Sequence, residues 1–287
     1  MQLTHIRYLD VAEPLASGHP FLSAASGLVQ IGETFCVVGD DEQHLAVFTQ
    51  GDDGPGRLIR LLPGDLPRKK KPRKKVKPDF EILFQLPDSG LICAMGSGST
   101  PKRMRGTIID IDGGGVTLLD LQPLFAAVAP LLKEINLEGA VVRGNRLLLF
   151  NRGNMQNPGT CICETALSAI TGDEAIAVTL VKTLALPMID GVPLTVTDAC
   201  SLDGRHILLS AVAEVTDDSY ADGAILGAAI VVLDANLNVL VIEPLEPICK
   251  IEGISARRTA TGAELLCVSD ADDPDMPSSL FSVMLDF

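Results

Sequence analysis

Hydrophobic and polar residues along this chain follow one plan that recurs five times. Each unit begins with a carboxylate or Ser and continues with a short apolar segment. It then turns at a Gly-containing stretch and returns through a second apolar segment to a polar end. Residues 137–154, LEGAVVRGNRLLLFNRGN, are the clearest example. Two short apolar runs around a turn rich in Gly and Asn predict a β-hairpin.

The units lie at nearly constant spacing. They align on Ser26, Glu81, Glu138, Asp198 and Glu252, which are 55, 57, 60 and 54 residues apart. Each period has room for two further strands after its hairpin, and four strands in a near-constant period are typical of a propeller blade. The sequence therefore predicts an all-β fold, a single five-bladed β-propeller over residues 1–287. A sixth, degenerate blade around residues 100–135 is the alternative.

The two ends of the chain, residues 3–11 and 280–287, are both apolar-rich and strand-like. In a propeller, strands from the two termini commonly share one blade, which closes the ring and removes a free sheet edge. We therefore expect the N- and C-terminal strands to lie side by side.

Composition narrows the class of protein. The chain is 47% hydrophobic, yet no apolar run reaches the roughly 18 residues of a transmembrane helix. The N-terminal residues MQLTHIRYLD lack the apolar core of a signal peptide. The seven cysteines are an odd number, and most lie inside apolar runs, which is typical of reduced core residues. We expect a cytoplasmic protein that does not contact membranes.

Charge is strongly negative overall and unevenly distributed. The net charge of −14 argues against general nucleic-acid binding. Residues 68–77, RKKKPRKKVK, nevertheless contain eight of the 23 basic side chains. Like charges at this density predict a solvated loop. A gate for an anionic ligand is the second interpretation, because the segment leads directly into Lys77 and Glu81, and a nuclear-targeting patch is a third.

A short helical insertion is predicted between the second and third units. Within residues 122–135 the apolar positions 124, 127, 128, 131, 132 and 135 have helical spacing, and Pro130 limits the helix to a short or kinked one.

The carboxylates that begin the units are the first candidate site. The innermost strand of each blade lines the propeller axis, so we expect Glu81, Glu138, Asp198 and Glu252 to converge at one mouth of the channel. Four carboxylates this close repel one another unless a metal, arginines or protons neutralise them. Oxygen ligands suit Ca²⁺ or Mg²⁺ better than zinc. Salt bridges to Arg103, Arg105, Arg152 and Arg257 are the alternative, and a cationic ligand is a third.

The stretch GSGST at residues 96–100 is a second candidate, together with the arginines that follow it. Small residues allow backbone N–H groups to converge on an anion, and arginines bind phosphate or carboxylate through two hydrogen bonds. The predicted substrate-binding residues are Arg103, Arg105, Ser97, Ser99 and Lys77. A tight turn with a structural Arg–Asp pair is the alternative.

Several familiar catalytic motifs are missing. The chain has no G-x-S-x-G and no H-E-x-x-H, and its four histidines do not cluster. An enzyme of this sequence would therefore use a carboxylate or a metal-bound water as its base. Our first hypothesis is a metal-dependent hydrolase of a small anionic phosphoester, ester or lactone, with Glu138, Glu252 and Arg152 as catalytic residues. The second is a non-catalytic propeller that binds a ligand or a protein partner. The oligomeric state stays open.

The segments KPDFE, GSGST, LEGA, LLLFNRGN and IEGI resemble an uncharacterised bacterial β-propeller family. That family is similar in turn to the phytase-like esterase propellers, whose blades also carry Glu-Gly before a strand, as in Glu138-Gly139 and Glu252-Gly253. The resemblance implies a propeller and, more loosely, a Ca²⁺-assisted ester or phosphoester hydrolase.

Overall fold

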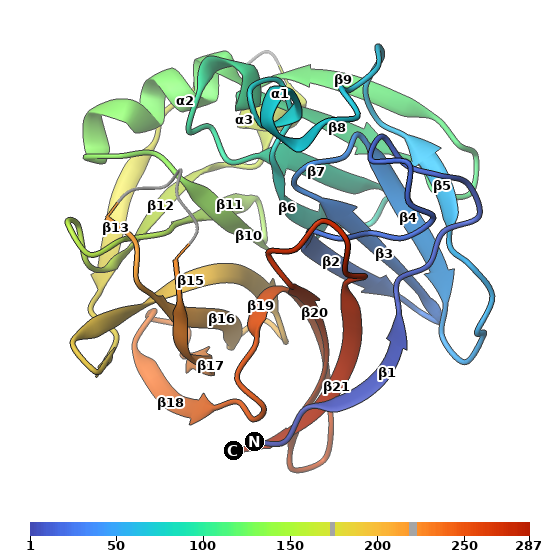
Figure 1. Ribbon diagram of the computed structural model, residues 1–287. Helices are drawn as coiled ribbons and strands as arrows, with labels where there is room; N and C mark the ends of the chain where they lie inside the picture. The colour runs from blue at the N-terminus through green and yellow to red at the C-terminus, as the bar shows by residue number, and fades with distance from the viewer. Residues whose placement is uncertain (173–175, 218–222) are drawn as a thin grey trace.

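The computed structural model describes residues 1–172, 176–217 and 223–287 and shows five antiparallel sheets around one axis (Figure 1). Blade one contains β2 (Ala25–Ile31), β3 (Thr34–Gly39), β4 (His44–Thr49) and β5 (Arg57–Arg60). Blade two contains β6 (Phe80–Gln85), β7 (Ile92–Gly96), β8 (Arg105–Ile109) and β9 (Val116–Asp120). Blade three contains β10 (Leu137–Arg143), β11 (Arg146–Asn151), β12 (Thr160–Ala166) and β13 (Thr179–Leu184).

Blade four has an additional edge strand and contains β14 (Met188–Ile189), β15 (Val192–Ser201), β16 (Ile207–Glu214), β17 (Ile225–Leu233) and β18 (Val239–Pro244). Blade five contains β19 (Lys250–Arg258), β20 (Gly262–Asp270), β21 (Ser279–Asp286) and, at its outer edge, β1 (Thr4–Tyr8). The N-terminal strand β1 pairs with the C-terminal strand β21, for example Thr4 with Ser282. The five-bladed fold and its closure by the two termini are therefore confirmed.

The helices are short and lie in the connections between strands. They are α1 (Lys70–Lys74), η1 (Pro101–Arg103), α2 (Gln122–Val128), η2 (Ala129–Leu131) and α3 (Ser168–Thr171). The predicted insertion is α2 followed by η2. Residues 100–135 form no sixth blade, because β8 and β9 complete blade two. Within the described ranges, no helix is both long and apolar enough to cross a membrane.

The core consists of five apolar clusters, one between each pair of neighbouring blades. Successive side chains of a strand point to opposite faces of its sheet. In β11, Leu147 and Leu149 face blade two, whereas Leu148 and Phe150 face blade four. Because both faces of each inner sheet are buried, these strands read as continuous apolar runs and not as alternating ones.

All five innermost strands carry a one-residue bulge at the same place. The pairing register shifts at Ser26, Glu81, Glu138, Thr197 and Glu252, each of which has no opposite residue on the second strand of its blade. A bulge redirects the side chain of the extra residue and increases the local twist of the strand. The repeated bulge thus sets which side chains face the propeller axis.

Glycines directly after three of these bulges bring neighbouring inner strands into close contact. A Cβ on Gly139 would lie 2.6 Å from the backbone N of Ala199, and one on Gly253 would lie 2.9 Å from the N of Leu28. A pocket of about 250 Å³ is lined by Leu28, Leu83 and other residues of the inner strands. It shares no lining residue with the polar cavity that is described in the next subsection.

We expect Gly139→Ala to destabilise the protein by about 1–3 kcal/mol, because the new methyl group would force backbone against backbone in a packed region. Urea or thermal denaturation measures this change. Gly204→Ala is the control, since a Cβ there meets no atom within 4 Å and the free energy of unfolding should change by less than about 0.5 kcal/mol. Equal stability of the two variants would contradict the close contact of β10 and β15.

Candidate functional site

A cavity of about 80 Å³ lies on the propeller axis, next to the bulges. Its lining comes from the starts of the innermost strands, the ends of the second strands and the segment that contains α1. The charged residues among them are the carboxyl groups of Asp40, Asp79, Glu81, Glu138, Glu214, Glu252 and Asp270 and the cations of Lys74, Lys77, Arg103, Arg152 and Lys250. Among the described residues of the lining, seven carboxyl groups against five cations leave a net charge of −2 when all are ionised.

The bulges place three glutamates in this cavity. Glu81, Glu138 and Glu252 each offer an oxygen within 4.8 Å of the others, and they are 8%, 3% and 4% exposed. The other two bulge residues connect neighbouring blades through hydroxyl groups. Ser26 Oγ donates a hydrogen bond to the Phe80 carbonyl, and Thr197 Oγ1 donates one of 2.6 Å to the Ile251 carbonyl.

Asp198 does not belong to this set. The residue of blade four that matches Glu81, Glu138 and Glu252 is Thr197, so our sequence alignment was shifted by one position there. Asp198 lies between β15 and β19, where its two oxygens accept hydrogen bonds of 2.7 Å from the N–H groups of Ala199 and Ile254. It does not line the cavity. The prediction that it shares a metal with the glutamates is not supported by this geometry.

Arg152 neutralises part of the glutamate ring. Its guanidinium lies 3.6 Å from both Glu138 Oε1 and Glu252 Oε1, and it donates a hydrogen bond to Glu214. Lys250 Nζ lies 3.3 Å from Glu252 Oε1. These two contacts of Glu252 Oε1 are ion pairs without hydrogen-bond geometry, and this oxygen is buried with no hydrogen-bond donor.

Glu138 and Glu81 also have carboxyl oxygens without a hydrogen-bond donor in the part of the chain that the structure describes. Glu138 Oε1 accepts a hydrogen bond of 2.5 Å from Asn136 Nδ2, but its buried Oε2 accepts none. Glu81 lines the cavity and has neither a hydrogen bond nor an ion pair to any described side chain. Buried polar atoms are normally satisfied, so oxygens of this kind call for a ligand, water or ion as partner.

Burial and crowding raise the pKa values of these carboxyl groups. Burial raises the pKa of Glu138 to about 8. Arg152 opposes this change and lowers the pKa, whereas the negative charge of Glu252 raises it. Burial, Asp79 and Glu138 raise the pKa of Glu81 well above its usual range. Without a bound cation, the cavity therefore holds protons on some of these groups at neutral pH.

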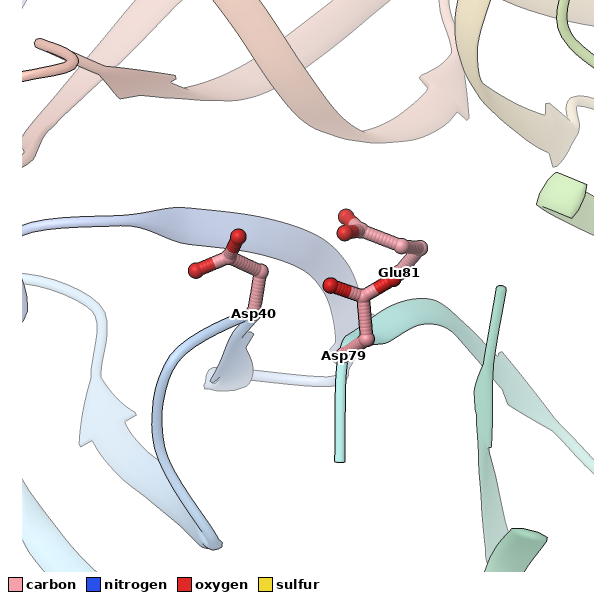
Figure 2. A group of neighbouring side chains, drawn as sticks. All are labelled: Asp40, Asp79 and Glu81. Atoms are coloured by element: carbon pink, nitrogen blue, oxygen red, sulfur yellow. The ribbon is translucent and has the colours of Figure 1, made fainter. Parts of the chain in front are cut away.

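A second group of charges surrounds Asp79 (Figure 2). Asp40, directly after β3, and Asp79 and Glu81, at the start of β6, offer oxygens within 4.8 Å of one another. Lys77 Nζ forms ion pairs with Asp40 and with Asp79 Oδ1, the latter at 2.8 Å. Arg103 Nη1 lies 2.8 Å from Asp79 Oδ2.

The structure places the predicted substrate-binding residues in different environments. Lys77 and Arg103 line the cavity but are already paired with carboxylates. Ser97 Oγ donates a hydrogen bond to Asp79, and Ser99 Oγ accepts one of 2.7 Å from Arg103. Both serines thus help to hold Asp79 and Arg103 in place. This arrangement agrees with the alternative interpretation of the segment, a tight turn with a structural Arg–Asp pair. Arg105 begins the third strand of blade two and does not line the cavity.

The basic segment is anchored, not wholly solvated. Arg73 in α1 is 2% exposed and lies 2.7 Å from Asp41 Oδ2, and Lys77 reaches the cavity. Arg257, considered as a partner of the ring, instead pairs with Glu264 near the surface.

Sequence reasoning did not place Asp40, Asp79, Glu214, Lys250 and Asp270 in the site. Two patterns in the sequence would have predicted four of these five residues. Asp79 and Lys250 stand two residues before the bulges at Glu81 and Glu252, and side chains two apart on a strand share a face. Asp40 and Asp270 belong to the polar ends of their repeat units, GDD and SDADD.

Several solved structures similar to this chain are named as glycoside hydrolases or galactanases. A proposed glycoside hydrolase from Parabacteroides distasonis has a TM-score of 0.53 and 11% identity, over 98% of this chain and 95% of the other. A proposed exo-β-1,3-galactanase from Bifidobacterium bifidum has the same TM-score and identity, over 98% and 94%. An exo-β-1,3-galactanase from Clostridium thermocellum has a TM-score of 0.52 and 11% identity, over 98% and 63%. At such identity the likeness shows the fold.

We expect Asp198→Asn to destabilise the protein by about 1–3 kcal/mol, because an amide has only one acceptor oxygen and its NH₂ group would face a buried N–H donor. Chemical denaturation of the two proteins measures the difference. Unchanged stability would show that Asp198 does not join β15 to β19.

Among curated proteins, no relative matches this chain. A family match spans almost all of the propeller, residues 21–285, which include all of the carboxylates and cations of the axial cavity. The chain belongs to this family, DUF6929, a family of unknown function.

Proposed function

We propose that this protein is a hydrolase whose axial cavity binds one divalent cation, Ca²⁺ or Mg²⁺, through Glu81, Glu138 and Glu252, and acts on a small anionic ester, phosphoester or lactone. The observation that carries the proposal is the unbalanced charge of a buried cavity. Its described lining residues comprise seven carboxyl groups and five cations, and Glu81 has no hydrogen bond or ion pair to a described side chain. A divalent cation matches the net charge of −2 that the ionised lining leaves.

The separation of the glutamate oxygens supports the same proposal. Oxygens bound to one Ca²⁺ at 2.3–2.6 Å lie no farther apart than about 5 Å. The three glutamates meet this limit with oxygens within 4.8 Å. A cation there would also give a partner to Glu138 Oε2 and Glu252 Oε1, which accept no hydrogen bond.

Within such a site the chain's own residues have separate tasks. Arg152 and Lys250 hold Glu252 in place, and Asn136 orients Glu138. The bound cation would attract an anionic substrate and lower the pKa of a water molecule. With the cation bound, Glu138 would be ionised and could accept a proton from that water. Arg103 and Arg152 are paired with protein carboxylates and orient Asp79 and the glutamates. Substrate binding by Arg103 stays a prediction.

A second candidate is cation-independent hydrolysis of a glycoside, by one protonated and one ionised carboxyl group. The high pKa of Glu138 favours it, because a glycosidase needs a carboxylic acid that keeps its proton near neutral pH. The structural neighbours named as glycosidases agree with this candidate. Hydrolysis of aryl glycosides in the presence of EDTA, lost in Glu138→Gln, would favour it. The phytase-like resemblance of the two Glu-Gly pairs stays a prediction.

We expect the chelator-treated protein to bind one equivalent of Ca²⁺ or Mg²⁺ and to unfold at a higher temperature in its presence. Calorimetry and thermal denaturation measure the two effects. Glu81→Gln should weaken cation binding at least tenfold, about 1.4 kcal/mol, because it removes the carboxylate that has no other partner.

Asp198→Asn is the matched control, since it removes the same charge from a carboxylate outside the cavity, and it should change the affinity less than twofold. The absence of cation binding in the wild-type protein, or equal affinity in Glu81→Gln, would remove the metal site. Cation binding without hydrolysis of model esters and phosphoesters would favour the non-catalytic binding propeller.

A further inference from the structure

The ammonium group of Lys77 sits where a second cation would bind. Asp40, Asp79 and Glu81 satisfy the same distance condition as the glutamate ring, with oxygens within 4.8 Å of one another (Figure 2). Lys77 Nζ forms ion pairs with two of them, Asp40 and Asp79. Its side chain is 9% exposed, so this positive charge is held inside the protein.

Glu81 connects this group with the ring. It is the one residue that belongs both to the group of Asp40 and Asp79 and to the group of Glu138 and Glu252. It is 8% exposed, lines the cavity and has no hydrogen bond or ion pair to a described residue. In enzymes with two metal ions, the ions lie about 3.5–4 Å apart and act together on one substrate. A carboxylate shared between two cation positions is the arrangement expected for such a pair.

We propose that the axial cavity has the layout of a two-cation centre in which Lys77 permanently fills the second position. The proposal rests on the proposed function for the first position, the ring of Glu81, Glu138 and Glu252. It assigns Lys77 to positioning: its ammonium donates a hydrogen bond to Asp40 and forms an ion pair with Asp79 Oδ1. A further N–H donor of the ammonium would then bind an anionic substrate that also contacts the divalent cation. The substrate class is then a small anion with two oxygens in reach, a phosphate or a carboxylate.

Replacement of Lys77 by an uncharged side chain tests this layout. Lys77→Met keeps the length of the side chain but removes the ammonium. Asp40, Asp79 Oδ1 and Glu81 could then bind a second divalent cation, while Asp79 Oδ2 stays paired with Arg103. Calorimetry with Ca²⁺ should give one equivalent for the wild-type protein and two for Lys77→Met. The melting temperature of Lys77→Met should be low in EDTA and should rise with Ca²⁺ more than that of the wild type.

Two further variants serve as controls. Lys74→Met removes another lysine that lines the cavity, at the end of α1, and it should bind one equivalent. The double variant Asp40→Asn/Lys77→Met removes a ligand of the second position and should return to one equivalent. Should Lys77→Met fail to fold, Lys77→Gln, which keeps a donor for Asp40, should also bind two equivalents.

The outcomes separate the two proposals. One equivalent in the wild type and two in the uncharged variants supports the two-cation layout. One equivalent in both overturns it and leaves the proposed metal site intact. No binding by the wild type overturns the proposed function itself, whatever the variants bind.

Discussion

The one-residue bulge at the start of each innermost strand is the constraint on which this molecule depends. The bulges lie at Ser26, Glu81, Glu138, Thr197 and Glu252. At three of them the following glycine lets neighbouring strands approach to backbone contact. The same feature thus brings neighbouring inner strands into contact and places the side chains of Ser26, Glu81, Glu138 and Glu252 at the cavity. Ser26 and Thr197 donate hydrogen bonds to the next blade, whereas the three glutamates bring their carboxyl groups close together.

The gathered charge is unfavourable for folding and is only partly compensated. Buried ions lose their hydration, and the attraction of partners restores this loss only where the geometry is good. Arg152 is shared among three glutamates, and Lys77 is shared between two aspartates, which spreads few cations over many carboxylates. The raised pKa values of Glu81, Glu138 and Asp270 have burial as their first cause and mark the remaining imbalance. A fold maintained only for stability could satisfy these positions with apolar side chains, so the imbalance is an argument for a ligand.

The basic segment contributes to this charge balance. Its residues 68–77 carry eight positive charges, yet two of them are buried as ion pairs of Arg73 with Asp41 and of Lys77 with Asp40 and Asp79. The segment therefore delivers cations to the acidic ends of β3 and β6, in addition to any role of its exposed lysines. The structural neighbours share the propeller, but fold alone does not assign their glycosidase activity to this chain.

The sequence by itself determined the five-bladed fold and much of the candidate site. Hairpins recur at an even period because each blade needs the same two buried inner strands, and Glu81, Glu138 and Glu252 could be found as the residues that begin these units. Only the tertiary structure decided between Asp198 and Thr197, because a shift of one residue reverses the direction of a side chain on a strand without changing the apolar pattern. It also decided the partners of each charge. Lys77 and Asp40 are 37 residues apart, and Arg152 and Glu214 are 62 apart, so their pairing depends on how the blades close around the axis.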